Sequence, residues 1–332
     1  MTQITQKDIA AALCVSRETV TKALSGDPKV ADDTRRAVLD KAGALGYTPN
    51  LLASSLASRR SRLVGVVVPH IAHPLFSVVV EELHRECRRR GYTMIPMISL
   101  DNRQYGLEGV RQLLSMRVAA MVLCTASPGS DPELDRLPRE LDVPAVLFGP
   151  EVENASCRCV VPDDRATAFR TASYAFSRGY ARPAFLCSDT VSRREEERRR
   201  GYLDAWTEFC PGSERPVIVP CGASRDEGCA AALRLLRSSW CPDFILASDG
   251  AVALGVCDAA RMEGLALPGQ FGVVALDEPP TGGEAFVLTR TVFSAARIAD
   301  AVVDQLFGAL SGETGPVRRT VPGELLLGGS CR

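Results

Sequence analysis

The sequence predicts a small helical head followed by an α/β body of two lobes. Three short amphipathic segments within residues 1–49 indicate the head, and apolar strand candidates alternating with helix candidates from residue 63 indicate the body. The body pattern repeats, because Arg-Gly-Tyr follows a helix candidate at residues 90–92 and again at residues 178–180. We therefore expect two doubly wound lobes, each a parallel sheet covered by helices on both faces.

Three short helices are expected in the head. Thr5 is suited to cap the first helix, Ser16 to cap the second, and Asp32 or Asp33 to begin the third. Two short helices joined by a tight turn and closed by a third form a helix-turn-helix. A small bundle that binds protein has the same periodicity, so the pattern alone leaves both interpretations open.

The charge of the chain is unevenly distributed. The first 62 residues contain ten basic and six acidic side chains, a formal charge of +4, whereas the remainder carries −5. All four lysines of the chain lie in this first part. A basic head on an acidic body indicates a polyanionic partner for the head alone.

In the body, strands are expected at 63–68, 93–98, 119–124, 144–148, 183–187, 216–220, 243–247 and 271–276. Helix candidates between them include 76–90, 104–116, 166–178 and 251–263. The run of arginines and glutamates at 193–200 is interpreted as a mostly solvated helix start. The segment after about residue 290 is expected to cross back to the first lobe.

Composition excludes several classes of protein. Hydrophobic residues make up 46% and charged residues 24%, which is typical of a globular chain and excludes a disordered or collagen-like one. No apolar stretch is long enough to span a bilayer, and no signal peptide is recognised, so a cytoplasmic protein without membrane contact is expected. The 12 cysteines are scattered without a Cys-x-x-Cys pair, which favours buried, reduced thiols.

No catalytic or cofactor motif is found. The chain lacks a Gly-x-Gly-x-x-Gly fingerprint after a strand, a phosphate-binding Gly-x-x-x-x-Gly-Lys-Ser/Thr loop and a Gly-x-Ser-x-Gly elbow. His70 and His73 are three residues apart in a proline-flanked loop, but no third ligand is evident nearby. We therefore expect no enzyme, no cofactor and no metal site.

Several short runs match a known family in order and spacing. They are Lys7-Asp8-Ile9-Ala10, Val15-Ser16, Thr19-Val20-Thr21-Lys22, Thr34-Arg35, Leu45-Gly46-Tyr47, Pro49-Asn50, Ala53-Ser54-Ser55-Leu56-Ala57 and Leu63-Val64-Gly65-Val66-Val67-Val68-Pro69. With these runs the chain resembles the LacI/GalR family of bacterial transcriptional regulators. The resemblance implies a helix-turn-helix head (1–49), a hinge (50–62) and a body (63–332) of periplasmic-binding-protein type. Lobe 1 is expected at about 63–160 and 292–320, and lobe 2 at about 162–289 and 321–332.

The resemblance also implies which side chains contact double-stranded operator DNA. A recognition helix places its first residues on base edges, here Arg17 and Glu18, with Lys22 one turn later. Arginine donates to guanine O6 and N7, and glutamate accepts from cytosine N4. Alternatively, Arg17 and Glu18 form a surface pair that reaches only phosphates. The expected phosphate contacts are Thr5, Ser16, Thr19, Thr21, Thr34 and Asn50.

Leu56 is a leucine in an otherwise small and polar tail. By resemblance, this tail becomes a helix on DNA, and the leucine is a wedge that enters a central base step from the minor groove. An apolar wedge unstacks the step and bends the duplex. The alternative is that Leu56 packs on the body.

Effector binding is expected in the cleft between the lobes, at the carboxyl ends of the strands. The residues implied by the resemblance are His73, Leu75, Phe76, Arg198, Ser248, Asp249, Asp277 and Phe293. Two alternatives stay open: Asp249 only caps a helix, and Arg198 only pairs with Glu195. Gly149 and Ala223 depart from the family pattern for pyranose binding, so the effector is expected to be a small polar molecule such as a sugar, sugar acid or phosphorylated sugar.

The expected function is therefore a homodimeric transcriptional repressor that binds a palindromic operator and responds to a small polar effector. No leucine heptad follows Leu310, which favours a dimer over a tetramer. The alternative is a small-molecule receptor with a vestigial DNA-binding head.

Overall fold

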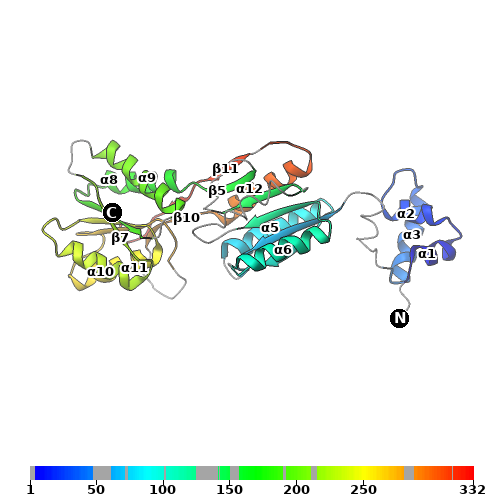
Figure 1. The fold of residues 1–332 in the computed structure, drawn as a ribbon, viewed down its shortest axis with the longest axis horizontal. Helices are drawn as coiled ribbons and strands as arrows, with labels where there is room; N and C mark the ends of the chain where they lie inside the picture. Colours follow the sequence, from blue (N-terminus) through cyan, green and yellow to red (C-terminus); the bar gives the residue numbers. More distant parts are fainter. Residues whose placement is uncertain are drawn as a thin grey trace. The chain divides into compact units, whose positions relative to one another are not determined.

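The protein is described from a computed structural model, which covers residues 4–47, 61–71, 74–100, 102–124, 141, 143–149, 157–189, 192–210, 215–279, 288–315 and 317–332. The chain forms two compact units, Met1–Ser61 and Arg62–Arg332 (Figure 1). We call the first unit the head and the second the body.

The head consists of three helices around one small core. They are α1 (Gln6–Leu13), α2 (Arg17–Leu24) and α3 (Asp32–Ala44). Each helix contributes one fully buried side chain to the core: Ile9, Val20 and Val38. Thr5 and Ser16 occupy the N-cap positions of α1 and α2, and α3 begins at Asp32, so the three predicted helices are confirmed.

The turn between α1 and α2 is tight because Cys14 adopts a left-handed conformation, with φ of 53°. The amide of Val15 then donates to the carbonyl of Ala10 at 3.1 Å, which closes the end of α1. Only a short connection therefore separates the two helices, and this is the arrangement of a helix-turn-helix.

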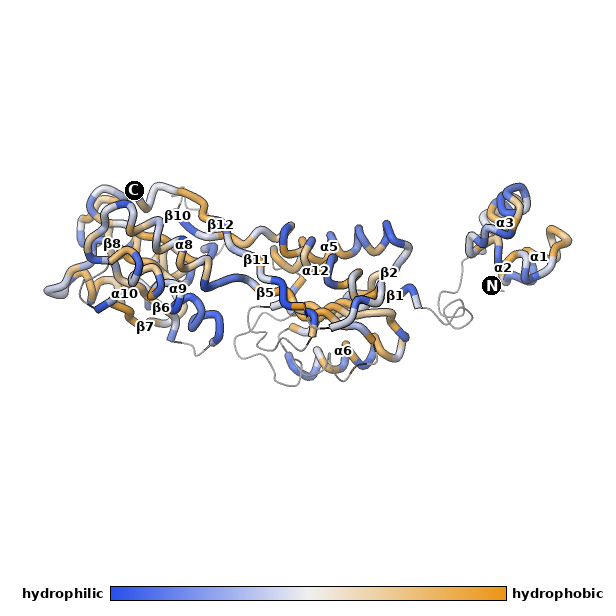
Figure 2. The backbone as a smooth tube through the Cα atoms, turned by 90° about the horizontal axis from the view of Figure 1, so that it is seen from above, coloured by the Kyte–Doolittle hydropathy of each residue, from blue (hydrophilic) through white to orange (hydrophobic). Residues whose placement is uncertain are grey.

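Lobe 1 of the body is built on a six-stranded parallel sheet. The strands are β1 (Leu63–Val68), β2 (Thr93–Ile98), β3 (Ala120–Cys124), β4 (Ala145–Phe148), β5 (Arg158–Pro162) and β11 (Arg318–Val321). Their order is β11-β5-β4-β3-β1-β2, and all pairings are parallel. The helices are α5 (Pro74–Arg89), α6 (Arg103–Ser115) and α12 (Ala295–Leu310). Figure 2 shows α5 and α12 on one face of this sheet and α6 on the other.

Lobe 2 is built on a second six-stranded sheet with the order β12-β10-β9-β8-β6-β7. The strands are β6 (Pro183–Ser188), β7 (Val217–Cys221), β8 (Phe244–Ala247), β9 (Gly272–Ala275), β10 (Thr289–Val292) and β12 (Glu324–Leu326). The helices are α8 (Asp164–Ser177), α9 (Arg193–Phe209), α10 (Arg225–Leu236) and α11 (Gly250–Met262). One apolar cluster lies under α8 and α9 and another under α10 and α11, so both faces are covered.

The expectation of purely parallel sheets is wrong at one edge. β12 pairs with β10 in the antiparallel direction, and such an edge strand is common on otherwise parallel sheets. β5, β10 and β11 were not predicted as strands because they are four or five residues long and each contains arginine. The chain passes between the lobes three times: after β5, between β10 and α12, and between β11 and β12.

The repeated Arg-Gly-Tyr tripeptide has the same structural role in both lobes. Gly91 and Gly179 end their helices with φ of +76° and +81°, which favours glycine. The tyrosine that follows packs against an aromatic ring of its own lobe, Tyr92 on Phe307 and Tyr180 on Phe244. The repeat therefore marks the return from helix to sheet.

All 12 cysteines are free thiols, and eight of them are buried. Burial raises the pKa of Cys124 to about 12 and that of Cys187 to about 11, so these thiols behave as small apolar core residues. Within the residues that the structure describes, no helix has the length and apolarity needed to cross a membrane.

Candidate functional site

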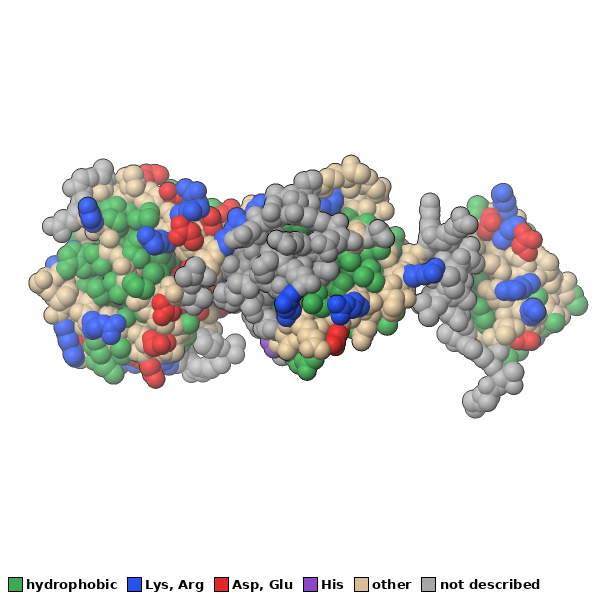
Figure 3. Space-filling model, viewed as in Figure 1, with side chains coloured by type: hydrophobic (Ala, Val, Ile, Leu, Met, Phe, Trp, Pro, Cys, Tyr) green, Lys and Arg blue, Asp and Glu red, His purple; other side chains and the backbone are tan. Residues whose placement is uncertain are grey.

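The first turn of α2 presents two charged side chains to solvent. Ser16 caps the helix, and its Oγ accepts from the amide of Thr19 at 3.0 Å. Val20 and Ala23 are buried on the core side of α2, so the opposite side, which carries Arg17 and Glu18, is exposed. Figure 3 shows basic and acidic side chains side by side on one face of the head.

The carboxylate of Glu18 is paired with the ammonium group of Lys22. The Oε1 and Nζ atoms are 2.7 Å apart, one helical turn from each other. The hydrogen bond and charge of Lys22 lower the pKa of Glu18, and those of Glu18 raise the pKa of Lys22. Glu18 therefore pairs with Lys22 and not with Arg17, and this surface pair must rearrange if either side chain contacts a base.

The small polar residues of the head lie at helix ends and in helix contacts. Thr5 donates from its amide and its hydroxyl to Asp8, at 2.7 and 2.8 Å. The Thr21 hydroxyl donates to the Gln6 side chain at 2.8 Å, which ties α2 to the start of α1. Thr34 is half-buried in the first turn of α3. Gln6 was missed because nothing in the sequence links it to a partner 15 residues away.

Two predicted DNA-contacting residues, Asn50 and Leu56, lie outside the described residues, as does the effector candidate His73. Their roles stay predictions.

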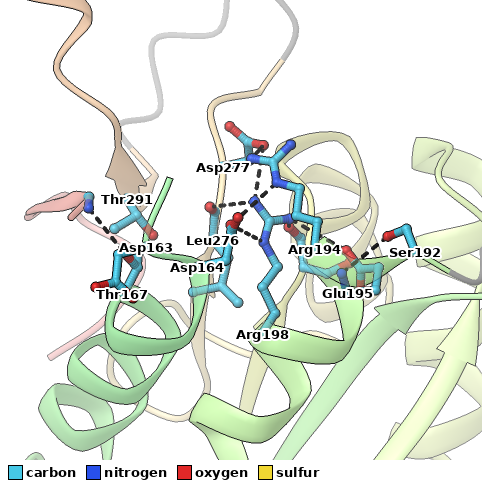
Figure 4. A network of polar contacts seen from close by, with 12 residues as sticks. Asp163, Asp164, Thr167, Ser192, Arg194, Glu195, Arg198, Leu276, Asp277 and Thr291 are labelled. Carbon is cyan, nitrogen blue, oxygen red and sulfur yellow. Dashed lines mark hydrogen bonds and ion pairs between the residues drawn. The ribbon is translucent and has the colours of Figure 1, made fainter. Parts of the chain in front are cut away.

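The body contains a buried polar network at the carboxyl end of the lobe 2 sheet, with Arg198 at its centre (Figure 4). Arg198 projects from α9 and is only 3% exposed. Each of its five guanidinium N–H groups has an acceptor within the protein. The acceptors are Asp164 (3.0 Å), Glu195 (3.5 Å), Asp277 (3.3 Å) and the main-chain carbonyls of Leu276 (3.3 Å) and Ser248.

Arg194 lies one turn before Arg198 and shares two of its carboxylates. Its Nη2 donates to Asp277 at 2.6 Å and its Nε donates to Asp164 at 3.3 Å. Asp164 is 6% exposed, whereas the side chains of Arg194 and Asp277 are 28% and 29% exposed. Arg194 and Asp277 are therefore the solvent-facing part of the network.

The charges of the network stabilise one another. Burial alone would lower the pKa of Arg198, but the carboxylates of Asp164, Asp277 and Glu195 raise it. Burial would raise the pKa of Asp277, but Arg194 and Arg198 lower it below its usual value. Burial dominates at Glu195 and raises its pKa. Arg198 and Asp277 are therefore firmly ionised.

This network adjoins the crossings between the lobes. Asp163 directly precedes Asp164, and its amide donates to the carbonyl of Val321 at the end of β11, at 2.8 Å. The amide of Gly323, in the last crossing, donates to Thr167 of α8 at 2.9 Å. Figure 4 shows Asp163, Thr167 and Thr291 beside the arginine cluster. A change in the network is thus positioned to reach the crossing segments.

Ser248 and Asp249 follow β8 at the same end of the sheet. Ser248 is fully buried, and its Oγ has no hydrogen-bond partner among the described residues. Asp249 is the N-cap of α11 and accepts from the amide of Ala251 at 2.6 Å. A Cβ on Gly250 would lie 2.2 Å from the nitrogen of Pro279, so the strand-end loop around residues 277–279 packs closely on α11.

The three apolar candidates pack in lobe 1. Phe76 is 3% exposed and meets Phe148 edge to face, at 6.0 Å between ring centroids. Leu75 and Phe293 are partly buried against the same core cluster. Phe76 is therefore mainly a core residue, and Leu75 and Phe293 keep some exposed surface.

The interpretation of residues 193–200 as a mostly solvated helix start is wrong for part of the run. Arg198 is buried, and Arg194 and Glu195 are largely covered. The physical reason is that their partners come from 30 to 83 residues away. Spacing gave one available signal, since residues 194 and 198 share a face of a helix. Asp164 carried no signal of its own. Among the described residues, no group of three or more His, Cys, Asp or Glu is arranged to hold a metal ion.

Two family models match the chain. Residues 5–50 match the model for bacterial regulatory proteins of the lacI family. Residues 61–282 match the model for periplasmic binding proteins and the sugar binding domain of the LacI family.

Curated relatives are similar over most of the chain. The transcriptional regulator GalR of Salmonella typhimurium is 27% identical over 276 residues, 82% of this chain and 80% of that protein. Catabolite control protein A of Priestia megaterium is 27% identical over 278 residues, 82% of each chain.

Two solved structures share the fold. The lac repressor dimer bound to operator and the anti-inducer ONPF has a TM-score of 0.80 at 20% identity, over 99% of each chain. The complex of the transcriptional regulator CelR with cellobiose has a TM-score of 0.66 at 22% identity, over 99% of this chain and all of that one.

Proposed function

The chain belongs to the LacI family of DNA-binding transcriptional regulators, which are not enzymes, and we propose that it represses transcription by binding a palindromic operator as a homodimer. The observation that carries this proposal is the exposed first turn of α2, capped by Ser16 and held on the core by Val20. A rigid helix with charged residues at its exposed start suits major-groove reading.

We assign base contacts to Arg17, Glu18 and Lys22. The Glu18–Lys22 pair at 2.7 Å opens when Glu18 accepts from a cytosine, which frees Lys22 for a neighbouring guanine or phosphate. Thr5, Ser16, Thr19, Thr21, Thr34 and Asn50 set the register on the phosphates. Leu56 enters the minor groove as a wedge. The protein acts in the cytoplasm, where bacterial DNA lies.

The dimer is proposed to form through α5 and β2 of lobe 1. A groove of about 740 Å³ lies there, lined by Val80, His84, Met94 and Pro96 among others. Ile98, at the end of β2, is 46% exposed, which is unusual for a large apolar residue and supports a covered surface in the dimer. Sedimentation velocity tests this: Ile98→Glu should give monomers, while Met262→Glu on α11 should leave the dimer intact.

The effector is proposed to be a small polar molecule, sugar-like, that binds over the solvent-facing part of the lobe 2 network. Asp277 is 29% exposed and presents a carboxylate to hydroxyl donors, and the buried Ser248 hydroxyl lacks a described partner. Because the five donors of Arg198 are already used, Arg198 acts on the effector mainly by orienting Asp277. His73, Leu75, Phe76, Asp249 and Phe293 complete the proposed site.

The effector is found by a thermal-shift screen of sugars, sugar acids and sugar phosphates. Asp277→Asn should abolish the shift given by the compound that stabilises the wild type, while operator affinity without that compound stays unchanged. An undiminished shift in Asp277→Asn would remove this residue from the site.

The DNA-binding proposal is tested by selecting random duplexes with the purified chain at near-physiological salt. A recovered palindrome supports a dimeric operator-binding protein. Sequence-independent binding that disappears with salt, also in the presence of cell extract, would instead favour the receptor with a vestigial head.

A further inference from the structure

All strands of the lobe 1 sheet begin at one edge, because every pairing in the sheet is parallel. The helices that lead into these strands end at the same edge. The chain itself enters the body there, since β1 begins at Leu63, directly after Arg62.

This edge is rich in arginine. We define the basic edge as Arg62, Arg88, Arg89, Arg90, Arg117, Arg158, Arg318 and Arg319. These residues precede β1, end or follow α5 and α6, or begin β5 and β11. Arg158 is buried and the others are exposed or half-exposed. The body has no lysine, so its basic residues are all arginines, the residue type that binds phosphate with two parallel hydrogen bonds.

Carboxylates neutralise only part of the basic edge. Glu86 pairs with Arg89 at 2.8 Å and with Arg90 at 3.4 Å. Asp304 pairs with Arg319 at 3.0 Å, and Glu313 pairs with Arg158 at 3.2 Å.

Arg62, Arg88 and Arg117 are exposed and form no ion pair with any residue that the structure describes. Cations are favoured at helix C-termini by the helix dipole, which accounts for Arg88 and Arg117 being there. The dipole does not use their hydrogen-bond donors, so these guanidinium groups remain available to an anion.

The opposite edge of lobe 1 differs in charge. There, where strands end and helices begin, Arg103 and Arg297 are balanced by Asp163 and Asp164. The excess of positive charge in lobe 1 is therefore confined to the edge at which the chain arrives from the DNA-binding head.

We propose that the basic edge binds the phosphate backbone of DNA that flanks the operator, as a second and sequence-independent contact. Only 14 residues separate Tyr47 from Arg62, a length that spans at most about 50 Å. A duplex held by the head is thus kept at high effective concentration near this edge. Phosphates accept from exposed guanidinium groups without any readout of base sequence. The proposal rests on DNA binding by the head.

The test compares the full-length wild type with the double variant R88Q/R117Q on two duplexes. One duplex ends at the selected operator, and the other carries additional random base pairs on both sides. The wild type should bind the flanked duplex more tightly, with a steeper salt dependence. R88Q/R117Q should lose this advantage, and its salt slope on the flanked duplex should fall by about 1 to 2, as for one or two lost phosphate contacts.

A matched control is R178Q/R182Q, because both residues are exposed at the corresponding edge of lobe 2 and the change in net charge is the same. This control should keep the flank advantage and the slope. The proposal is overturned if the wild type binds both duplexes equally, or if the two double variants lose affinity to the same extent. Failure of operator binding itself appears separately, as loss of affinity for the short duplex in the wild type.

Discussion

The head and the lobe 2 network both carry charged functional candidates, but they hold them in opposite ways. In the head, Arg17 and Glu18 stand in solvent, and their positions depend on a cap and on apolar residues of the same short helix. In lobe 2, Arg198 is 3% exposed and bonded to groups from four other segments. The head is thus built to exchange partners, and the network is built to keep them.

This difference predicts where substitutions will act. An exposed side chain on a stable helix can be removed with little effect on folding, so its loss should appear in DNA recognition. A buried ion cluster leaves uncompensated charges when one member is removed, so its loss should appear in stability.

The largest effect is expected for Arg198→Ala. It leaves the buried carboxylate of Asp164 without its main partner, and such a loss costs about 3–5 kcal/mol of the free energy of unfolding. Urea unfolding followed by tryptophan fluorescence measures it, because the two tryptophans, Trp206 and Trp240, both lie in lobe 2. The exposed neighbour Arg199 is the control, and Arg199→Ala should stay within about 0.5 kcal/mol of the wild type. Equal stability of both variants would contradict a structural role for the network.

A smaller effect is expected for Gly201→Ala. The added Cβ would lie 2.2 Å from the carbonyl oxygen of Arg165, so α9 must move away from α8. Overpacking of this kind costs about 1–3 kcal/mol. In the head, a Cβ added to Gly43 would meet no atom within 4 Å, and Gly43→Ala should stabilise α3 by about 0.5–1 kcal/mol. Thermal unfolding of both variants measures these opposite signs, and a destabilising Gly43→Ala would show that the head is as tightly packed as lobe 2.

Next in size is Ser16→Ala, which removes the N-cap of α2. The amide of Thr19 loses its acceptor at 3.0 Å, which costs about 0.5–2 kcal/mol of head stability. Hydrogen exchange of α2 amides measures the local loss. The fluorescence transition of lobe 2 should not move, and a joint shift would mean that the two units unfold together.

The smallest effect is a pH dependence at Asp277. Its pKa is lowered in the folded chain by Arg194 and Arg198, despite burial, so it adds stability above its unfolded value of 3.8 and loses this as pH falls through its folded pKa. The stability difference between the wild type and Asp277→Asn should therefore be constant from pH 7 to 5 and shrink below about pH 4. A difference that grows on acidification would refute this ion pairing.

The comparison also explains what could be predicted from the sequence. The helices of the head depend on caps and on apolar residues a few positions apart, and these local signals placed α1, α2 and α3 correctly. The alternation of strands and helices gave the two-lobed α/β body in the same way.

The polar network could not be predicted in this way, because its bonds join residues 30 to 83 positions apart. Arg198 was singled out only through the family resemblance, and its partners Asp164 and Arg194 were not. Short strands such as β11, Arg-Arg-Thr-Val, are held by pairing with β5 and not by their own hydrophobic pattern.

The central claim is that sequence recognition lies in the exposed first turn of α2. It is tested most directly by measuring the affinity of the wild type and of Arg17→Ala for the selected operator and for operators with each base pair changed in turn. The account predicts that Arg17→Ala loses about 1–3 kcal/mol on the operator and becomes indifferent to one base pair in each half-site. An equal loss on every sequence would contradict it, because Arg17 would then contact only phosphates.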